Sequence, residues 1–385
     1  MTEPTASRLP AGLRLPFDPL LALAAIGLMV ASILQLDAST GAIGDAHSFA
    51  VRQMIFFAVG TAMAIVLSRL DYSRLRELKY GVYALMMAGI VLVALFGGVT
   101  NGTRRAIQLP FFEVQASELG KVLLIVALAA FAVDRARGLG ERDTTARLVL
   151  VAMVPAILVM ATDLGTGLVY IVILLSVLFV VGVGWRHFAG LVALGTVSIC
   201  FVLIAAPAVG VTVVKPYQTA RLTAFLKPSA DPGKAGYQQN QSRIAIGAGQ
   251  KTGRGKLSTQ GPLKFLPEQR TDFPFAAIAE RWGFAGAGLV LSLYALLIWR
   301  GLRILTVAKN LYGALIAGGI VAMLLFQVFI NVGMNVGIMP ITGIPLPLLS
   351  YGGSSVIATL LAIGLLQSIY AQGRVAAATK GRGRF

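Results

Sequence analysis

Long apolar segments dominate this chain of 385 residues and limit the class of fold that it can adopt. A helix needs about 20 mostly apolar residues to cross the roughly 30 Å hydrocarbon core of a bilayer, and about ten segments qualify. They are 19–35, 49–67, 81–100, 119–133, 147–162, 164–183, 188–206, 284–299, 311–334 and 354–371. With 57% hydrophobic and 13% charged residues, the composition excludes a soluble domain. Because no alternating pattern of membrane strands is present, we expect an all-α polytopic membrane protein of about ten transmembrane helices.

The basic residues predict how these helices are oriented in the membrane. On one side the loops and tails contain 18 Lys or Arg residues, whereas the short loops of the other side contain only Arg104 and Arg105. The basic segments are 1–18, 68–80, 134–147, 184–187, 300–310 and 372–385, and the short loops opposite are 36–48, 101–118 and 335–353. By the positive-inside rule both termini are expected to be cytoplasmic tails. The net charge of +17 therefore reflects orientation, and no nucleic-acid partner is expected.

The connection 208–273, between the seventh and eighth spans, is the longest in the chain and is expected outside the cytoplasm. It contains ten basic and three acidic residues together with apolar and aromatic ones. One interpretation is a solvated loop, because long loops are exempt from the orientation rule. The other is a folded basic surface over a membrane cavity, suited to an anionic headgroup such as a pyrophosphate. We favour the second, because connections longer than about 15 residues tend to be functional or disordered and this composition is not typical of disorder.

Two stretches at the expected outer ends of the spans depart from plain membrane helix. Three prolines and three glycines within 338–353 forbid a continuous helix, so this stretch lies either against a cavity or in an interfacial turn. Asp163 stands between the fifth and sixth spans. We interpret it first as the cap of the sixth helix and alternatively as part of a polar cavity or cation site.

Residues 117–121 introduce charge at the start of the fourth span. Ser117 is predicted to cap this helix, with Glu118 near the positive end of its dipole. Lys121 lies one turn inside, where an unpaired ammonium costs about 2.5–3.5 kcal/mol. It should therefore have an anionic partner. Either Lys121 reaches the interface beside Glu118, or it meets Asp272 arriving from the outer loop.

Several separated motifs, in this order along the chain, resemble the SEDS (shape, elongation, division and sporulation) family. They are NGTRRAIQL and SELGK within 101–121, TDLGTGLV at 162–169, RLTAFLKPSADPGKAGYQQNQSRIAIGAGQ at 221–250, LKFLPEQRTDFPFA at 263–276 and NVGMNVGIMPITGIPLPLLSYGGSS at 331–355. The resemblance covers nearly all of the chain as one domain, 1–385, and is stronger to the elongation-type members than to the division-type members. Ala106, Ala116, Arg270 and Arg281 depart from the usual residues but remove no carboxylate or lysine.

The resemblance implies a peptidoglycan glycosyltransferase that polymerises lipid II at the outer face of the bacterial inner membrane during cell elongation. The family pattern makes Asp272 the catalytic base, although this residue could instead cap a short helix over 273–283. Glu268, the nearest alternative carboxylate, is ranked second. Lys121 and Glu118, like Glu268, are expected to be supporting residues. The residues expected at the substrate, chiefly at its pyrophosphate, are Arg104, Arg105, Arg221, Arg243 and Asp163. For any single arginine, solvated loop charge is an equally good interpretation.

The family is also associated with a divalent cation, Mg or Mn, which would neutralise a pyrophosphate, although no compact His or carboxylate cluster marks a protein metal site. No organic cofactor is expected. The single cysteine, Cys200, allows neither an intramolecular disulfide nor a cysteine metal cluster. The implied partners are a class B penicillin-binding protein transpeptidase and other membrane proteins of the elongation complex.

Two other functions compete with polymerisation. A lipid II flippase is the main alternative, and midplane carboxylates, broken helices and internal repeats would favour it. The sequence shows no convincing internal repeat, and the acidic residues singled out above cluster toward the expected outer face. A scaffold that only binds partners would explain the cytoplasmic basic loops but not the basic outer loop with its aspartate.

Overall fold

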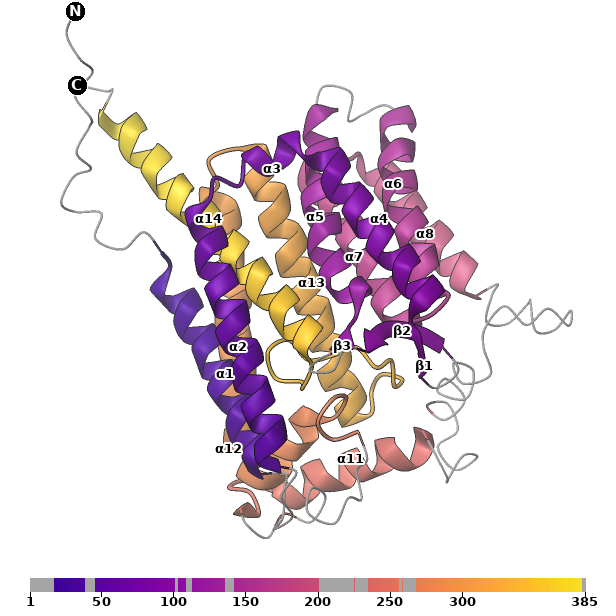
Figure 1. The fold of residues 1–385 in the computed structure, drawn as a ribbon, viewed down its shortest axis with the longest axis vertical. Helices are drawn as coiled ribbons and strands as arrows, with labels where there is room; N and C mark the ends of the chain where they lie inside the picture. Colours follow the sequence, from indigo (N-terminus) through magenta and orange to yellow (C-terminus); the bar gives the residue numbers. More distant parts are fainter. Residues whose placement is uncertain are drawn as a thin grey trace, which may run out of the picture.

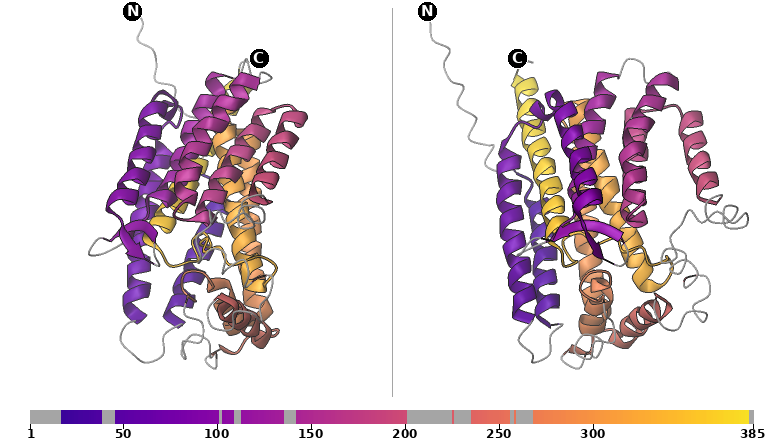
Figure 2. Two further views of the ribbon diagram at one scale, coloured as in Figure 1. Left: turned by 90° about the vertical axis from the view of Figure 1, so that its right-hand side faces the viewer. Right: turned by 45° about the vertical axis from the view of Figure 1, so that its right-hand side comes forward.

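The structure is a computed structural model. It describes residues 17–38, 46–100, 103–108, 113–135, 142–200, 225, 235–255, 258 and 268–382. Within these ranges the chain forms a bundle of long helices, with a short three-stranded sheet and one further helix at an end of the bundle (Figures 1 and 2).

The helices of the bundle agree with the predicted spans. They are α1 (Pro19–Ala38), α2 (Ala46–Arg69), α4 (Lys79–Phe96), α5 (Ala116–Asp134), α6 (Arg142–Met160), α7 (Leu164–Val181), α8 (Trp185–Cys200), α12 (Pro274–Val307), α13 (Leu311–Val336) and α14 (Gly353–Arg382). In the described part of the chain, eight of them are long and apolar enough to cross a membrane, while α6 and α8 offer shorter apolar stretches. The predicted class, an all-α polytopic membrane protein, is confirmed.

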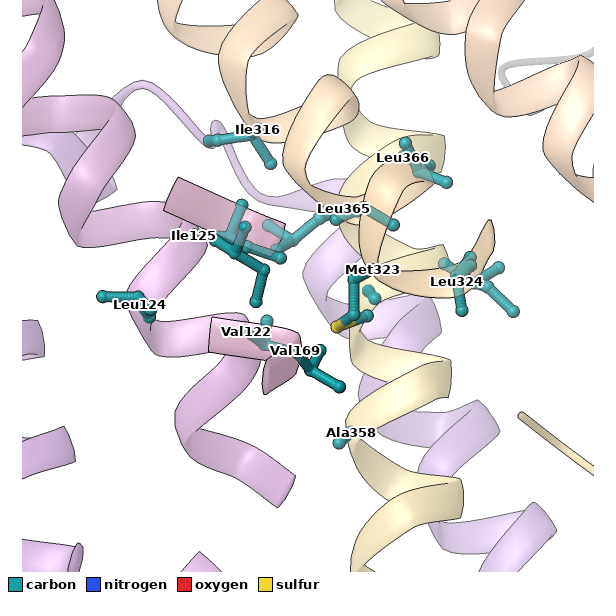
Figure 3. Close-up of a cluster of buried hydrophobic side chains, with 14 of the residues drawn as sticks. Val122, Leu124, Ile125, Val169, Ile316, Met323, Leu324, Ala358, Leu365 and Leu366 are labelled. Carbon is teal, nitrogen blue, oxygen red and sulfur yellow. The ribbon is translucent and has the colours of Figure 1, made fainter. Parts of the chain in front are cut away.

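The core of the bundle lies between α5, α7, α13 and α14. Buried residues make up 72% of the spanning segment in each of α5, α13 and α14 but only 17% in α4, so α4 is peripheral. Figure 3 shows the side chains that meet there, among them Val122, Leu124, Ile125, Val169, Ile316, Met323, Leu324, Ala358, Leu365 and Leu366. Because lipid tails are as apolar as these residues, close packing rather than escape from water holds such helices together.

One end of the bundle gathers most of the irregular structure. The sheet, the helix α11 (Ala235–Gly249), the start of α12 and the loop between α13 and α14 lie at this end (Figure 1). The start of α1, the one-turn helix α3 (Arg74–Glu77) and the last turns of α14 lie at the opposite end. Within the described ranges, the segments that carry predicted site residues are therefore brought to a single end of the bundle.

The sequence analysis is wrong about the segment before α5. The third span was expected to reach residue 100, but α4 ends at Phe96 and β1 (Gly98–Thr100) follows. This strand pairs antiparallel with β2 (Thr103–Gln108), which in turn pairs with β3 (Glu113–Val114). No strand was predicted here.

The prediction that Ser117 caps α5 is also wrong. Gln115 occupies the N-cap position, and its N–H donates to Oγ of Ser354 at 3.0 Å. Ser354 lies in the first turn of α14, and its hydroxyl donates to the carbonyl of Glu113 at 2.8 Å. A contact with a distant helix therefore decides where α5 begins.

Helix α12 is interrupted at Gly283, which has φ 63° and ψ −158°. The break leaves the N–H groups of Phe284 and Ala285 without partners in their own helix. The carbonyls of Gln250 and Lys251, just after α11, accept from them at 2.8 and 3.2 Å. The end of α11 is thereby fixed to α12 at its break.

Candidate active site

The predicted base lies in a tight turn that leads into α12. The N–H groups of Asp272 and Phe273 donate to the carbonyl of Glu268 at 2.9 and 3.1 Å, and the hydroxyl of Thr271 donates to Oε2 of Glu268 at 2.8 Å. Phe273 occupies the N-cap position and Pro274 begins the helix, as is common for proline. Asp272 therefore precedes the position from which a capping side chain acts, and it is only partly buried.

Two asparagines of α13 hold the backbone of this turn. Nδ2 of Asn331 and Nδ2 of Asn335 both donate to the carbonyl of Asp272, at 3.1 and 3.2 Å. Oδ1 of Asn335 accepts from the N–H of Ala276 at 3.0 Å, which satisfies a free donor in the first turn of α12. Both asparagines are fully buried, and Asn331 also donates to the carbonyl of Ile344 at 2.9 Å. Buried amides with this many partners fix the relative positions of the elements that they join.

The loop 337–352 holds the other side of the turn. The hydroxyl of Ser350 donates to the carbonyl of Thr271 at 2.6 Å, and the N–H of Tyr351 donates to the carbonyl of Arg270 at 2.9 Å. As predicted from its prolines and glycines, this loop is not helical, and many of its residues are buried against protein.

The same loop contains a strained residue. Leu348 has a φ of 62°, which is unusual for a residue with a Cβ. The neighbouring backbone is held tightly, because the hydroxyl of Tyr294 donates to the carbonyl of Pro347 at 2.6 Å and the hydroxyl of Ser32 donates to the carbonyl of Leu349 at 3.0 Å. Such strain persists only where surrounding contacts over-determine the backbone, and it is frequent at functional sites.

Lys121 and Glu118 form a second cluster at the start of α5. Nζ of Lys121 lies 2.6 Å from Oε2 of Glu118, and both side chains are almost completely buried. Of the two predicted partners of Lys121, the structure gives Glu118, and within the described residues it shows no contact between Lys121 and Asp272. The alternative in which this lysine reaches the membrane interface is excluded by its burial.

Arg105 and Asp163 form a third group, which lies at the turn between α6 and α7. Nε of Arg105 donates to the carbonyl of Thr162 at 3.0 Å, and Asp163 caps α7 by accepting from the N–H of Thr166 at 3.1 Å. The preferred interpretation of Asp163 as a cap is confirmed. A cavity of about 60 Å³ lies beside Arg105, Thr162 and Ser117, which is room for water but not for a sugar.

Of the three remaining predicted arginines, two lie within the described residues. Arg243 is an exposed residue of α11, and its side chain lies against Gly337, the left-handed residue that ends α13. Arg104 lies on β2 with its backbone opposite Val99. Arg221 lies outside the described residues.

The loop 337–352 contacts two of these positions, the Asp272 turn and the start of α7. Its Ile344 is bonded to Asn331 beside the Asp272 turn, and its Thr342 packs closely on Gly165 in the first turn of α7. No group of three or more His, Cys, Asp or Glu side chains in the described ranges is arranged to hold a metal ion.

Sequence reasoning missed Asn331, Asn335 and Ser350 as residues of this site. Two asparagines four residues apart lie on one face of a helix, and amides inside an apolar span rarely lack a function. That spacing was the available signal. For Ser350 no local signal exists, since its partner Thr271 is 79 residues away.

The chain matches the FtsW/RodA/SpoVE family, described as cell cycle proteins, over residues 14–375. It belongs to this family. The SEDS assignment made from the motifs is thus confirmed. Peptidoglycan glycosyltransferase MrdB of Escherichia coli K12 is 36% identical over 92% of this chain and 93% of that protein.

Solved structures agree with this assignment. A chain from a study described as "Structural coordination of polymerization and crosslinking by a peptidoglycan synthase complex" superposes with a TM-score of 0.75 at 30% identity, over 93% of this chain and 98% of that one. Rod shape determining protein RodA of Thermus thermophilus gives a TM-score of 0.67 at 28% identity, over 94% and 98%. The SEDS relatives that match include RodA and MrdB, as expected for an elongation-type member, as well as FtsW and stage V sporulation protein E.

Proposed function

We propose that this protein is a peptidoglycan glycosyltransferase that polymerises lipid II at the outer face of the bacterial inner membrane during cell elongation. The observation that carries the proposal is the turn containing Asp272, which is fixed by α13 and by the loop 337–352 at the irregular end of the bundle. A family match over nearly the whole chain, with relatives named as peptidoglycan glycosyltransferases, supports it.

The chemistry assigns a role to each group. A hydroxyl of the acceptor sugar attacks the anomeric carbon of the donor, the bond from that carbon to the lipid pyrophosphate breaks, and the hydroxyl proton passes to the carboxylate of Asp272. Positive charge must stabilise the departing pyrophosphate, and Arg104, Arg105, Arg221 and Arg243 are the proposed sources. The proposal includes a Mg or Mn ion bound to the pyrophosphate of the substrate, where it would only neutralise charge.

Orientation and partner are also proposed. The basic loops and tails favour cytoplasmic termini, which puts the end with Asp272 outside, where the disaccharide of lipid II would be polymerised. A structural neighbour comes from a synthase complex that coordinates polymerisation with crosslinking. We therefore expect a class B penicillin-binding protein as the crosslinking partner, together with other elongation-complex membrane proteins.

A polymerisation assay with purified protein and lipid II in detergent tests the function, because neither a flippase nor a scaffold makes glycan chains. We expect Asp272→Asn to remain folded and to bind lipid II but to lose about 10²–10⁴ in rate, since an amide cannot take the proton. Glu268→Gln, a matched change on an exposed carboxylate, should be damaged less. Normal polymerisation by Asp272→Asn with loss in Glu268→Gln would move the base to Glu268, and no effect of either would overturn the mechanism.

A further inference from the structure

The backbone carbonyls of three consecutive residues, Arg270, Thr271 and Asp272, each accept hydrogen bonds from donors outside the turn. The bonds run from the N–H of Tyr351 to Arg270, from the hydroxyl of Ser350 to Thr271, and from the amides of Asn331 and Asn335 to Asp272. A turn of this kind needs no such bonds merely to connect two elements. Their effect is to fix the peptide planes that precede and follow the Cα of Asp272, and hence the direction in which its Cβ points.

Ser350 makes the shortest of these bonds, and it does so from a buried position. Its side chain is 1% exposed, and its hydroxyl accepts from the N–H of Leu346 at 2.8 Å while donating to Thr271 at 2.6 Å. Using both capacities of a hydroxyl fixes its orientation. The Oγ atom of Ser350 thus links the backbone of the loop 337–352 to the carbonyl of Thr271.

The loop itself is held by the helices α1 and α2. Nε2 of Gln53 donates to the carbonyl of Ser350 at 3.3 Å, and the ring of Phe49 packs edge-on against Tyr351 at a centroid distance of 5.2 Å. The guanidinium of Arg270 lies over the same Phe49 ring, 4.3 Å from its centre. Gln53 and Ser32, both fully buried, place polar groups of α2 and α1 where the loop crosses these helices.

We propose that Ser350 and Asn331 are positioning residues that hold the backbone of Asp272 so that its carboxylate faces the acceptor hydroxyl. The inference rests on the proposed function, in which Asp272 is the base. A displacement of about 1 Å at a reacting group can cost roughly 100-fold in rate. Because both side chains act on the turn through its backbone carbonyls, their loss should slow the chemical step without weakening the binding of lipid II.

The test compares Ser350→Ala and Asn331→Ala with Ser368→Ala in the full-length protein. Ser368 is a matched control, since it is fully buried and its hydroxyl donates to the carbonyl of Leu70 at 2.7 Å at the opposite end of the bundle. Each protein is assayed for melting temperature, for kcat and for KM with lipid II. We expect kcat to fall by roughly 10- to 100-fold in both site variants, with KM within about twofold of the native value and kcat of Ser368→Ala unchanged.

Several results would overturn the positioning role. They are an unchanged kcat in a folded site variant, a rise in KM with kcat preserved, an equal loss in Ser368→Ala, or loss of folded protein in both site variants, which would make the residues structural only. If Ser350→Ala alone fails to fold, kcat of Asn331→Ala tests the positioning role.

Asp272→Asn in the same assay separates the positioning role from the assignment of Asp272 as the base. Normal activity there refutes the base assignment, whereas an inactive Asp272→Asn beside a fully active Ser350→Ala refutes only the positioning.

Discussion

Lys121 and Glu118 form a buried ion pair one turn apart on α5, with 2.6 Å between Nζ and Oε2 and only 2% and 3% of their side chains exposed. The second oxygen of Glu118, Oε1, has no hydrogen-bond partner in the described structure. Removing two charges from water is costly, so the pair is weak evidence of net stabilisation. Each buried charge nevertheless requires the other, because removing one leaves its partner buried and unpaired.

We therefore expect Glu118→Gln to lower the free energy of unfolding by about 3–5 kcal/mol, because it leaves the ammonium of Lys121 buried without a counter-charge. The double variant Glu118→Gln with Lys121→Met should recover much of this loss, since it removes both charges. Denaturation of the purified proteins in one detergent measures both effects. A single variant as stable as the native protein would show that water or lipid headgroups reach the site.

At the end of the bundle where α1 begins, Asp18 and Arg300 join α1 to α12. Asp18 is fully buried, accepts from Nε of Arg300 at 2.9 Å and caps α1 by accepting from the N–H of Leu21 at 3.0 Å. Asp18→Asn keeps an acceptor for the cap but loses the charge, so it should lower the free energy of unfolding by about 2 kcal/mol. The rate per folded molecule should be unchanged, which polymerisation below the melting temperature would check.

A matched change at the surface provides the control for Asp18. Asp71 accepts from Lys309 at 3.2 Å, but 45% of its side chain is exposed. Exposed pairs contribute little, so Asp71→Asn should leave the melting temperature nearly unchanged. Equal effects of the two variants would mean that burial does not determine the strength of these contacts.

The features that the sequence predicts correctly are encoded locally. The spans follow from apolar length, the non-helical stretch after α13 from its prolines and glycines, and the role of Asp163 from the preference of aspartate for helix starts. The last predicted span, 354–371, is only part of α14, which continues to Arg382. Hydropathy locates the part of a helix that lies in the membrane but not the end of the helix. The alanine-rich segment 376–378 favours continuation of α14 beyond the span.

The features that the sequence misses depend on distant partners. The start of α5 is shifted to Ala116 by a bond between Gln115 and Ser354, 239 residues apart. The sheet over 98–114 is too short for a periodic signal. Asp272 could be placed by family motif, but the bonds that fix its backbone come from residues 59 to 63 positions away, which no local pattern connects.

Membrane orientation gives a further prediction. Lys251, just after α11, and Arg374, near the end of α14, lie at opposite ends of the bundle (Figure 1). With 18 basic residues on one side and two in the short loops of the other, a reporter fused after Lys251 should be extracytoplasmic and one fused after Arg374 cytoplasmic. Both reporters on one side would refute the topology, including the outer placement of Asp272.

The turn that follows α11 meets α12 at its break with almost no space between the backbones. Gly253 has a φ of 86°, and its N–H donates to the carbonyl of Gly249 at 2.8 Å. A Cβ at Gly253 would lie 2.1 Å from the carbonyl oxygen of Arg281. Since the obstacle is backbone, neither partner can move without separating the turn from α12.

Gly253→Ala should therefore destabilise the junction by more than the roughly 1–2 kcal/mol that a left-handed backbone alone costs a residue with a Cβ. Gly247→Ala is the matched control, because Gly247 lies on α11 with no atom within 4 Å of the added Cβ, and alanine there should be neutral or stabilise the helix by up to about 1 kcal/mol. Hydrogen exchange over 235–255 measures the difference: amides of α11 should exchange faster in Gly253→Ala and not in Gly247→Ala. Because α12 begins two residues after Asp272, kcat should fall with the first change and persist with the second. Equal protection of α11 in the two variants would show that the loop is held by other contacts than this close backbone approach.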